Sequence, residues 1–147
     1  MHVITGATGQ LGSRIVDRLL ERVPASLVGV SVRDVDKAAA LAERGVRVRA
    51  GDFTDPAGLV HAFAGAQQVL VVSAAIMGPA AAEANRAAID AACAAGAQRI
   101  LYTSHQAASP DSLFPPQTVH AVTEEHLAGL GVPYTALRNG FYASALA

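Results

Sequence analysis

The chain has 147 residues, of which 52% are apolar and 16% are charged, and its formal net charge is -1. This length suits one domain with a buried core, and this composition excludes a disordered chain. The basic residues are scattered along the sequence, which excludes the concentrated basic surface that nucleic acid requires.

The single cysteine, Cys93, excludes an internal disulfide and favours a reducing, cytoplasmic location. No basic leader precedes an apolar stretch at the start of the chain. The uncharged stretch from Ala62 to Ala82 is long enough to cross a membrane, but Gln67, Gln68 and the Gly78–Pro79 pair interrupt it. A buried strand followed by a loop explains this stretch better, so we expect no membrane span. We also expect no metal site in this chain.

Short apolar runs alternate with longer helical patterns along the chain. The predicted strands are His2–Thr5, Leu27–Arg33, Val46–Ala50, Val69–Ser73, Arg99–Thr103 and Tyr134–Arg138. The first predicted helix has an apolar stripe of Leu11, Ile15, Leu19 and Val23. The later ones are Val35–Arg44, Pro56–Ala64, Pro79–Ala95 and a last helix with the stripe Val119, Val122, Leu127 and Leu130. The proline-containing stretch Ser109–Gln117 is predicted to be irregular.

The strand sequences indicate how the sheet is built. Most are continuous aliphatic runs, which are typical of strands covered on both faces, whereas Val46–Arg49 alternates like an edge strand. Strands that alternate with helices predict a parallel sheet with right-handed crossovers. We therefore predict an α/β fold, a doubly wound parallel sheet of about six strands in the order 3-2-1-4-5-6, which is the NAD(P)-binding Rossmann arrangement. One such domain is expected over residues 1–147.

Three glycines, Gly6, Gly9 and Gly12, lie at three-residue intervals between the first strand and the first helix. Gly6 would permit a tight turn, Gly9 would let the backbone approach a pyrophosphate, and Gly12 would let the helix pack closely on the strand. The start of the helix would present unpaired N–H groups to the anion, with Thr8 and Gln10 as further donors. The alternative is that these glycines serve only the turn and its packing.

The residues after the second strand indicate which dinucleotide binds. An acidic residue there reads the ribose 2′-hydroxyl of NAD, whereas an arginine accommodates the 2′-phosphate of NADP. Arg33 comes first in this sequence and Lys37 follows, which favours NADP and a preference for NADPH over NADH. Asp34 supports the NAD alternative if it points inward, and a third interpretation is a charge pair in a solvated loop.

Five segments together resemble the NmrA-like, atypical short-chain dehydrogenases, and among them the bacterial NAD(P)H:quinone oxidoreductase branch. The segments are GATGQLG after the first strand, VR at the end of the second, GDFTD after the third, LYTSH at the fifth and YTALRNGFY at the sixth. The resemblance covers essentially the whole chain. It implies an NAD(P)H-dependent oxidoreductase that transfers hydride from NADPH to a quinone-like small molecule.

The resemblance also implies a set of cofactor-binding residues at the carboxyl ends of the predicted strands. Those expected to wrap the pyrophosphate are Gly6, Ala7, Thr8, Gly9, Gln10 and Leu11, with Gly12 closing the loop. The others are Arg33 at the 2′-phosphate, Asp52 and Phe53 beside the adenine, and Ser73, Ala74 and Ala75 along the nicotinamide-side ribose. Leu137, Arg138, Asn139, Gly140, Phe141 and Tyr142 would border the nicotinamide.

The chain departs from ordinary short-chain dehydrogenases because it lacks their Tyr-xxx-Lys pair. Lys37 is the only lysine, and no tyrosine lies between Val119 and Leu130. The corresponding sequence, HAVTEEHL, places His120 and Glu124 four residues apart on one helix face. Hydride transfer to a quinone makes no alkoxide, so a strong acid-base pair is less necessary for it than for an alcohol dehydrogenase.

Two histidines are the candidate proton donors, because imidazole titrates near neutral pH. They are His105 and His120, and Ser104 lies where ordinary relatives place a substrate-orienting serine. The alternatives are an exposed His120 at the start of the helix, a His105 that lines the site without being essential, and surface charges at Glu124 and Glu125.

Family chains continue beyond the sixth strand into a part that shapes the substrate pocket, and we expect that part to be absent from this sequence. The 147-residue chain is therefore expected to bind cofactor but to turn over quinone poorly or not at all. Phe141, Tyr142 and Leu146 would be uncovered, which favours self-association, with a homodimer as a candidate assembly. The alternative function is a non-catalytic NAD(P)-binding redox sensor of the NmrA type, which the missing Tyr-xxx-Lys pair suits equally.

Overall fold

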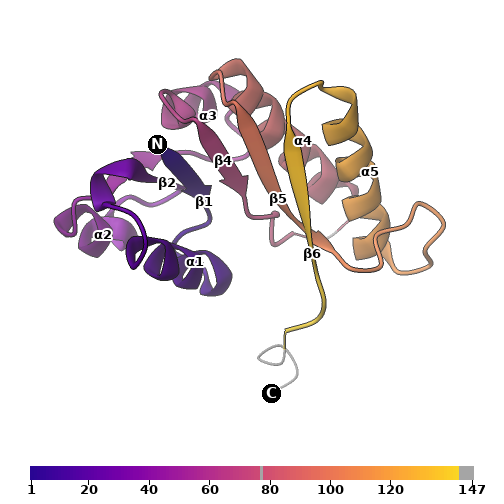
Figure 1. Ribbon diagram of the computed structural model, residues 1–147. Helices are drawn as coiled ribbons and strands as arrows, with labels where there is room; N and C mark the ends of the chain where they lie inside the picture. Colours follow the sequence, from indigo (N-terminus) through magenta and orange to yellow (C-terminus); the bar gives the residue numbers. More distant parts are fainter. Residues whose placement is uncertain (77, 143–147) are drawn as a thin grey trace.

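In the computed structural model, which describes residues 1–76 and 78–142, helices flank a six-stranded sheet (Figure 1). All neighbouring strands are parallel. The strands are β1 (His2–Thr5), β2 (Val28–Val32), β3 (Arg47–Ala50), β4 (Gln68–Val71), β5 (Arg99–His105) and β6 (Tyr134–Asn139). Their order across the sheet is β3-β2-β1-β4-β5-β6, which confirms the predicted doubly wound arrangement.

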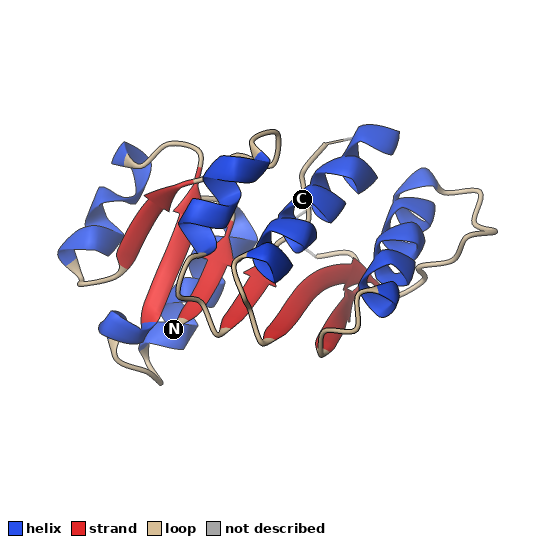
Figure 2. Ribbon diagram, turned by 90° about the horizontal axis from the view of Figure 1, so that it is seen from above, coloured by secondary structure: helices blue, strands red, loops and turns tan. Residues whose placement is uncertain are grey.

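Helices connect the successive strands and cover both faces of the sheet (Figure 2). They are α1 (Gln10–Leu20), α2 (Ala39–Glu43), α3 (Pro56–Phe63), α4 (Pro79–Ala94) and α5 (Pro115–Gly129), with short 3-10 helices at Ala25–Leu27 and Asp36–Ala38. No helix within the described residues is both long enough and apolar enough to pass through a membrane.

Some predicted boundaries were wrong for local reasons. Leu27 belongs to a 3-10 turn, in which its N–H donates to Pro24, so β2 begins one residue later than predicted. The predicted helix Val35–Arg44 is split into a 3-10 turn and the short helix α2. Helix α5 begins at Pro115, inside the stretch predicted to be irregular, because proline suits the first turn of a helix, where its missing N–H is not needed.

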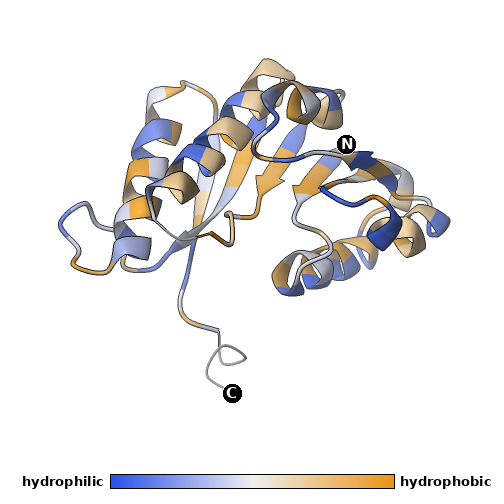
Figure 3. Ribbon diagram, turned by 180° about the vertical axis from the view of Figure 1, so that it is seen from behind, coloured by the Kyte–Doolittle hydropathy of each residue, from blue (hydrophilic) through white to orange (hydrophobic). Residues whose placement is uncertain are grey.

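The core lies in two layers, one on each face of the sheet. Val3 and Ile4 are neighbours in β1 but belong to different layers, because successive side chains of a strand point to opposite faces. The layer of Val3 contains Phe63 of α3, Ile89 of α4 and Leu127 of α5. The layer of Ile4 contains Val16 of α1. In Figure 3 the central strands are largely apolar, whereas the helices carry both polar and apolar residues.

Helix α1 lies close against the turn that follows β1 because position 12 carries no side chain. A Cβ atom on Gly12 would lie 2.1 Å from the carbonyl oxygen of Gly6 and 2.6 Å from its carbonyl carbon. Gly6 has a φ of +64°, which glycine adopts without strain. The turn predicted at Gly6 and the close packing predicted at Gly12 are therefore confirmed.

The contact between Gly12 and Gly6 predicts a large stability difference between two matched substitutions. Gly12→Ala should lower the free energy of unfolding by about 3 kcal/mol, because the new methyl group would overlap backbone atoms that cannot move aside. Gly129→Ala should leave stability unchanged or raise it by up to about 1 kcal/mol, since a Cβ there meets no atom within 4 Å among the described residues and alanine favours a helix. Urea denaturation measures both; equal stabilities for the two variants would contradict the packing argument.

Candidate functional site

The predicted site residues gather along one edge of the sheet, which we call the carboxyl edge because all the strands end there. Strands β1 to β6 are parallel, so the segments that follow them emerge on the same side. Strand β1 has β2 on one side and β4 on the other, and the connections leave toward opposite faces at this point. Open α/β sheets bind ligands at such a switch in strand order.

The loop formed by residues 6–12 leaves backbone N–H groups available at the start of α1. The N–H of Gly9 donates to the oxygen of Gly6 at 3.0 Å, and the N–H of Ser13 donates to the oxygen of Gly9 at 3.0 Å. Within the described residues, no side chain caps α1 and no acidic residue lies in its first turn. A Cβ on Gly9 would meet only the oxygen of Gly6, at 3.3 Å. The loop therefore fits an anion such as a pyrophosphate.

The charged residues after β2 have distinct roles. Asp34 accepts a hydrogen bond from the N–H of Asp36 at 3.1 Å, and its carboxylate lies 3.5 Å from the ammonium of Lys37. The interpretation as a solvated charge pair is therefore confirmed for Asp34 and Lys37. Arg33 is exposed and forms no hydrogen bond or ion pair with any described residue. Its guanidinium is the group at this end of β2 that can meet an anion.

Asp52, which follows β3, lies within the electrostatic reach of Arg33. Its Oδ1 accepts hydrogen bonds from the N–H of Thr54 at 2.8 Å and from the hydroxyl of Thr54 at 2.7 Å. The backbone bond, then the hydroxyl bond, and finally the charge of Arg33 hold the pKa of Asp52 below its usual value, against a slight opposing effect of burial. Phe53, beside it, is half-buried against the core.

Buried side chains fix the backbone that follows β4. The N–H of Ser73 donates to the hydroxyl of Thr103 at 2.8 Å, and the N–H of Ala74 donates to Oδ1 of Asn85 at 2.8 Å. Thr103 is 4% exposed and Asn85 is 1% exposed. Ser73 and Ala74 are thus half-buried and held in place, while Ala75 is exposed.

His120 is half-buried, so the alternative of an exposed residue at the start of the helix was wrong. Its Nδ1 lies 2.7 Å from the hydroxyl oxygen of Tyr102, a residue with no exposed surface. Burial, and then the nearby His105, lower the pKa of His120, and the charge of Glu124 only partly offsets them. These effects favour the neutral form of the His120 imidazole. Burial, more than any other cause, raises the pKa of Tyr102, which stays protonated.

His105 ends β5 within an aromatic cluster. Its Nδ1 accepts a hydrogen bond from the N–H of Ala107 at 3.2 Å, and its Nε2 is buried with no partner among the described residues. The ring stacks beside His120 with centroids 6.3 Å apart, and the rings of Phe114 and Phe141 lie at 6.5 and 5.4 Å. The cluster joins β5, the loop before α5 and the segment after β6.

The expectation that Glu124 is a surface charge was also wrong, whereas Glu125 is exposed as predicted. The hydroxyl of Ser104 donates to Oε1 of Glu124, and Arg138 donates to both carboxylate oxygens, at 2.9 and 2.6 Å. Burial alone would raise the pKa of Glu124, but the hydrogen bonds from Arg138 and Ser104 outweigh it and hold that pKa below its usual value. Ser104 and Arg138 are thus committed to one carboxylate.

The segment Leu137–Tyr142 is tied to the rest of the carboxyl edge at several points. The N–H of Gln106 donates to the oxygen of Asn139 at 2.9 Å, and a Cβ on Gly140 would lie 3.0 Å from the side chain of Gln106. Leu137, Phe141 and Tyr142 are exposed, as expected for apolar residues without cover, while Leu146 lies outside the described residues.

Two residues at this edge, Asn85 and Tyr102, were not among the predicted site residues. Both are buried, and Nδ2 of Asn85 donates to the hydroxyl of Tyr102 at 3.1 Å. Each carried a signal, because Asn85 is a poor helix former within an alanine-rich helix, and Tyr102 carries a hydroxyl into an aliphatic strand.

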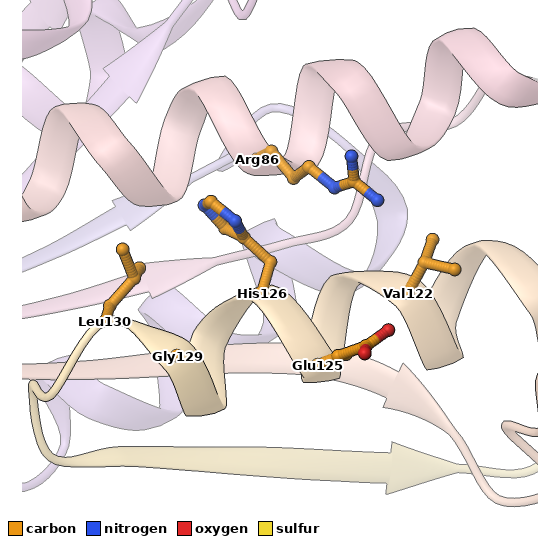
Figure 4. A pocket seen from close by; sticks show the side chains of 6 residues that line it. All are labelled: Arg86, Val122, Glu125, His126, Gly129 and Leu130. Atoms are coloured by element: carbon orange, nitrogen blue, oxygen red, sulfur yellow. The ribbon is translucent and has the colours of Figure 1, made fainter.

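A hollow of about 310 Å³ between α4 and α5 contains none of the predicted site residues (Figure 4). It is lined by Arg86, Val122, Glu125, His126, Gly129 and Leu130. Nε2 of His126 lies 2.6 Å from a carboxylate oxygen of Asp90 on the facing helix. The hollow is formed by the later turns of α5, away from the carboxyl edge and from the predicted cofactor-binding residues.

Comparison with known proteins connects this geometry to a family. Residues 6–145 match a family model described as NAD(P)H-binding. The chain is 43% identical over 145 residues to quinone oxidoreductase 2 of Escherichia coli, and 29% identical over 146 residues to an NmrA-like family domain-containing oxidoreductase of Aspergillus flavus. These alignments cover 97% and 96% of the chain, but 49% and 48% of those proteins. The chain thus spans about half the length of the curated relatives it matches.

Two solved structures share both the fold and a substantial part of the sequence of this chain. Triphenylmethane reductase from Citrobacter, solved with NADP(H), superposes with a TM-score of 0.95 at 38% identity, over 99% of this chain and 51% of that one. The Escherichia coli quinone oxidoreductase, solved with NADPH, gives a TM-score of 0.91 at 42% identity, over 98% of this chain and 50% of that one. The resemblance indicated by the sequence motifs is confirmed.

The environment of Glu124 predicts how stability depends on pH. Because its pKa is depressed in the folded state, the negative charge stabilises the fold fully above about pH 5 and progressively less as pH falls through the folded pKa, below the unfolded value of about 4.3. Glu124→Gln should therefore be less stable than the parent at pH 7, and the difference should shrink toward pH 3. Glu125→Gln, the same change at an exposed neighbour, should show almost no difference at either pH.

Chemical denaturation between about pH 3 and pH 7 measures this stability difference. A difference for Glu124→Gln that stays constant across this range would contradict the role of the carboxylate charge.

Proposed function

The chain belongs to the NAD(P)H-binding family, and from that premise we propose that it binds NADPH at the carboxyl edge and reduces a quinone. The observation that carries the cofactor choice is the division of roles after β2. Arg33 is exposed and free of partners among the described residues, whereas Asp34 is engaged with Asp36 and Lys37. An arginine in this place suits a 2′-phosphate. Asp34 is already bonded to Asp36 and Lys37, so it is less available to accept a hydrogen bond from a 2′-hydroxyl.

Different segments of the carboxyl edge would bind different parts of this cofactor. Residues 6–12 would hold the pyrophosphate with backbone N–H groups, and Arg33 would hold the 2′-phosphate. Asp52 and Phe53 would border the adenine, and residues 73–75 the nicotinamide-side ribose. Residues 137–142 would border the nicotinamide. The glycines at 6, 9 and 12 supply the close backbone approach that such a ligand needs.

The quinone acceptor is supported by the relatives and by the chemistry of the edge. When bound, the reduced nicotinamide supplies a hydride with its electron pair, and one proton from solvent completes the hydroquinone. Phe114 and Phe141 offer apolar rings beside the imidazole of His105, and together these rings suit a planar acceptor. Glu124 holds Arg138 and so fixes the end of β6 beside this cluster. Positioning of this kind supplies much of the catalysis in a hydride transfer.

We propose a reducing, cytoplasmic setting and a homodimer as the assembly. The single cysteine supports the first, since the chain has no internal disulfide. The exposed side chains of Phe141, at 65%, and Tyr142, at 45%, support the second. Sedimentation velocity at several protein concentrations tests the assembly.

The role of Arg33 predicts the cofactor preference. The chain should bind NADPH about ten- to a hundredfold more tightly than NADH, because charge-assisted hydrogen bonds contribute about 1.5–3 kcal/mol. Arg33→Ala should remove most of this preference, whereas Arg22→Ala, which removes the same charge from an exposed residue after α1, should keep it. Titration calorimetry with both cofactors provides the comparison, and equal affinities in the parent would refute the assignment.

The proposed reaction predicts quinone-dependent oxidation of NADPH. With a panel of benzoquinones and naphthoquinones, cofactor absorbance at the nicotinamide band should fall slowly, as expected from the sequence, but faster than in a control without protein. Gly9→Val should abolish both NADPH binding and this oxidation, because a branched side chain would occupy the path of the pyrophosphate while the extended backbone at position 9 accepts valine. Tight NADPH binding without oxidation of any quinone would instead indicate a non-catalytic redox sensor.

A further inference from the structure

A chain of buried hydrogen bonds leads from a backbone N–H at the nicotinamide side of the edge to His120. It begins at Ala74, whose N–H donates to Oδ1 of Asn85 at 2.8 Å. A backbone N–H can only donate, so the atom it meets must be the oxygen of the amide. The orientation of the Asn85 amide is thereby fixed, and its nitrogen faces the hydroxyl of Tyr102 at 3.1 Å.

The orientation of Asn85 determines what the Tyr102 hydroxyl does with its proton. The amide nitrogen can only donate, so the oxygen of Tyr102 accepts that bond. Tyr102 has no exposed surface and keeps its proton, which must be given to another acceptor. Two groups face it: the hydroxyl of Thr123, which donates its own proton to the oxygen of Val119 at 2.8 Å, and Nδ1 of His120, at 2.7 Å. We take Nδ1 of His120 as the acceptor, because its distance is that of a direct hydrogen bond.

The direction of these bonds settles the tautomer of His120. If Nδ1 accepts from Tyr102, a neutral ring carries its one proton on Nε2. Nε2 has no hydrogen-bond partner among the described residues and is not among their buried unpaired polar atoms. It is therefore not fully buried, and the His120 ring lies beside that of His105, with the centroids 6.3 Å apart.

We propose that Asn85 and Tyr102 are positioning residues that hold His120 with its proton on Nε2, as a neutral hydrogen-bond donor to the oxygen of the acceptor. The role of His120 as a donor during reduction rests on the proposed function, whereas the position of the proton on its ring does not. As hydride and its electron pair arrive at the quinone, negative charge develops on the acceptor oxygen, and the N–H of His120 stabilises that charge. The proton that completes the hydroquinone comes from solvent, and His120 keeps its own.

This role differs from that of a general acid in its dependence on pH. The groups that face His120 are Tyr102 and His105 from β5, Asn85 from α4 through Tyr102, and Glu124 on its own helix. A general acid would lose rate as pH rises above its pKa, because the donating form disappears. A neutral donor keeps its N–H, so the rate should stay level from about pH 7 to about pH 8.5, above the ordinary histidine pKa of about 6.5.

Nuclear magnetic resonance of the protein with 15N-labelled histidine reads the tautomer without cofactor or substrate. In the parent at pH 7.5, His120 should show an unprotonated Nδ1 and a protonated Nε2. Tyr102→Phe and Asn85→Ala should each release this preference and give a mixture of tautomers. Tyr134→Phe, the same change as Tyr102→Phe at an exposed tyrosine of β6, should leave the His120 signals unchanged. A protonated Nδ1 in the parent, or a fixed tautomer in Tyr102→Phe, would overturn the proposal.

Single-turnover oxidation of NADPH by a quinone then tests the donor role. Tyr102→Phe should lower the rate while the Kd for NADPH stays unchanged, and His120→Ala should lower it about 100-fold, the usual effect of losing one donor to a developing charge. A parent rate that falls tenfold per pH unit above pH 7 would overturn the neutral-donor role in favour of a general acid. If the parent oxidises no quinone, both the proposed function and the donor role of His120 are wrong. The tautomer of His120 is tested separately, by the nuclear magnetic resonance spectrum.

Discussion

The close approach of Gly12 to the carbonyl of Gly6 is the constraint on which the site depends. Helix α1 can begin directly after the turn only because no Cβ intervenes at position 12, where one would lie 2.1 Å from that carbonyl oxygen. This contact aims the N-terminus of α1 along the carboxyl edge and places Val16 in the layer of Ile4. The position and direction of the N–H groups that we propose for phosphate binding therefore follow from packing.

The topology was predictable from sequence because it depends on patterns that are local. Aliphatic runs alternate with helical stripes, and that alternation permits few arrangements other than a doubly wound parallel sheet. The errors fell at boundaries, where one or two hydrogen bonds decide. Leu27 turns back onto Pro24, and Pro115 opens α5 although prolines on either side of it suggested a loop. Neither outcome is encoded in periodicity.

The backbone part of the site was predictable and the side-chain part was not. Glycine spacing and Arg33 are signals within single segments, and the structure leaves them where the sequence analysis expected them. The environments of His120 and Glu124 depend on partners from other elements. Tyr102 reaches His120 from β5, and Arg138 reaches Glu124 from β6, at separations of 18 and 14 residues. One sequence does not reveal which residues a helix face will meet, so Glu124 was expected at the surface and exposure was left open as an alternative for His120.

The central claim is that the carboxyl edge, and not the hollow between α4 and α5, receives the dinucleotide. Amide chemical shifts recorded during an NADPH titration of the 15N-labelled chain test it most directly. The account predicts that the largest shifts occur at residues 6–12, at Arg33 and at residues 73–75, with little change at the residues lining the hollow. Shifts concentrated at Val122, His126 and Leu130, with the glycine loop unchanged, would contradict it.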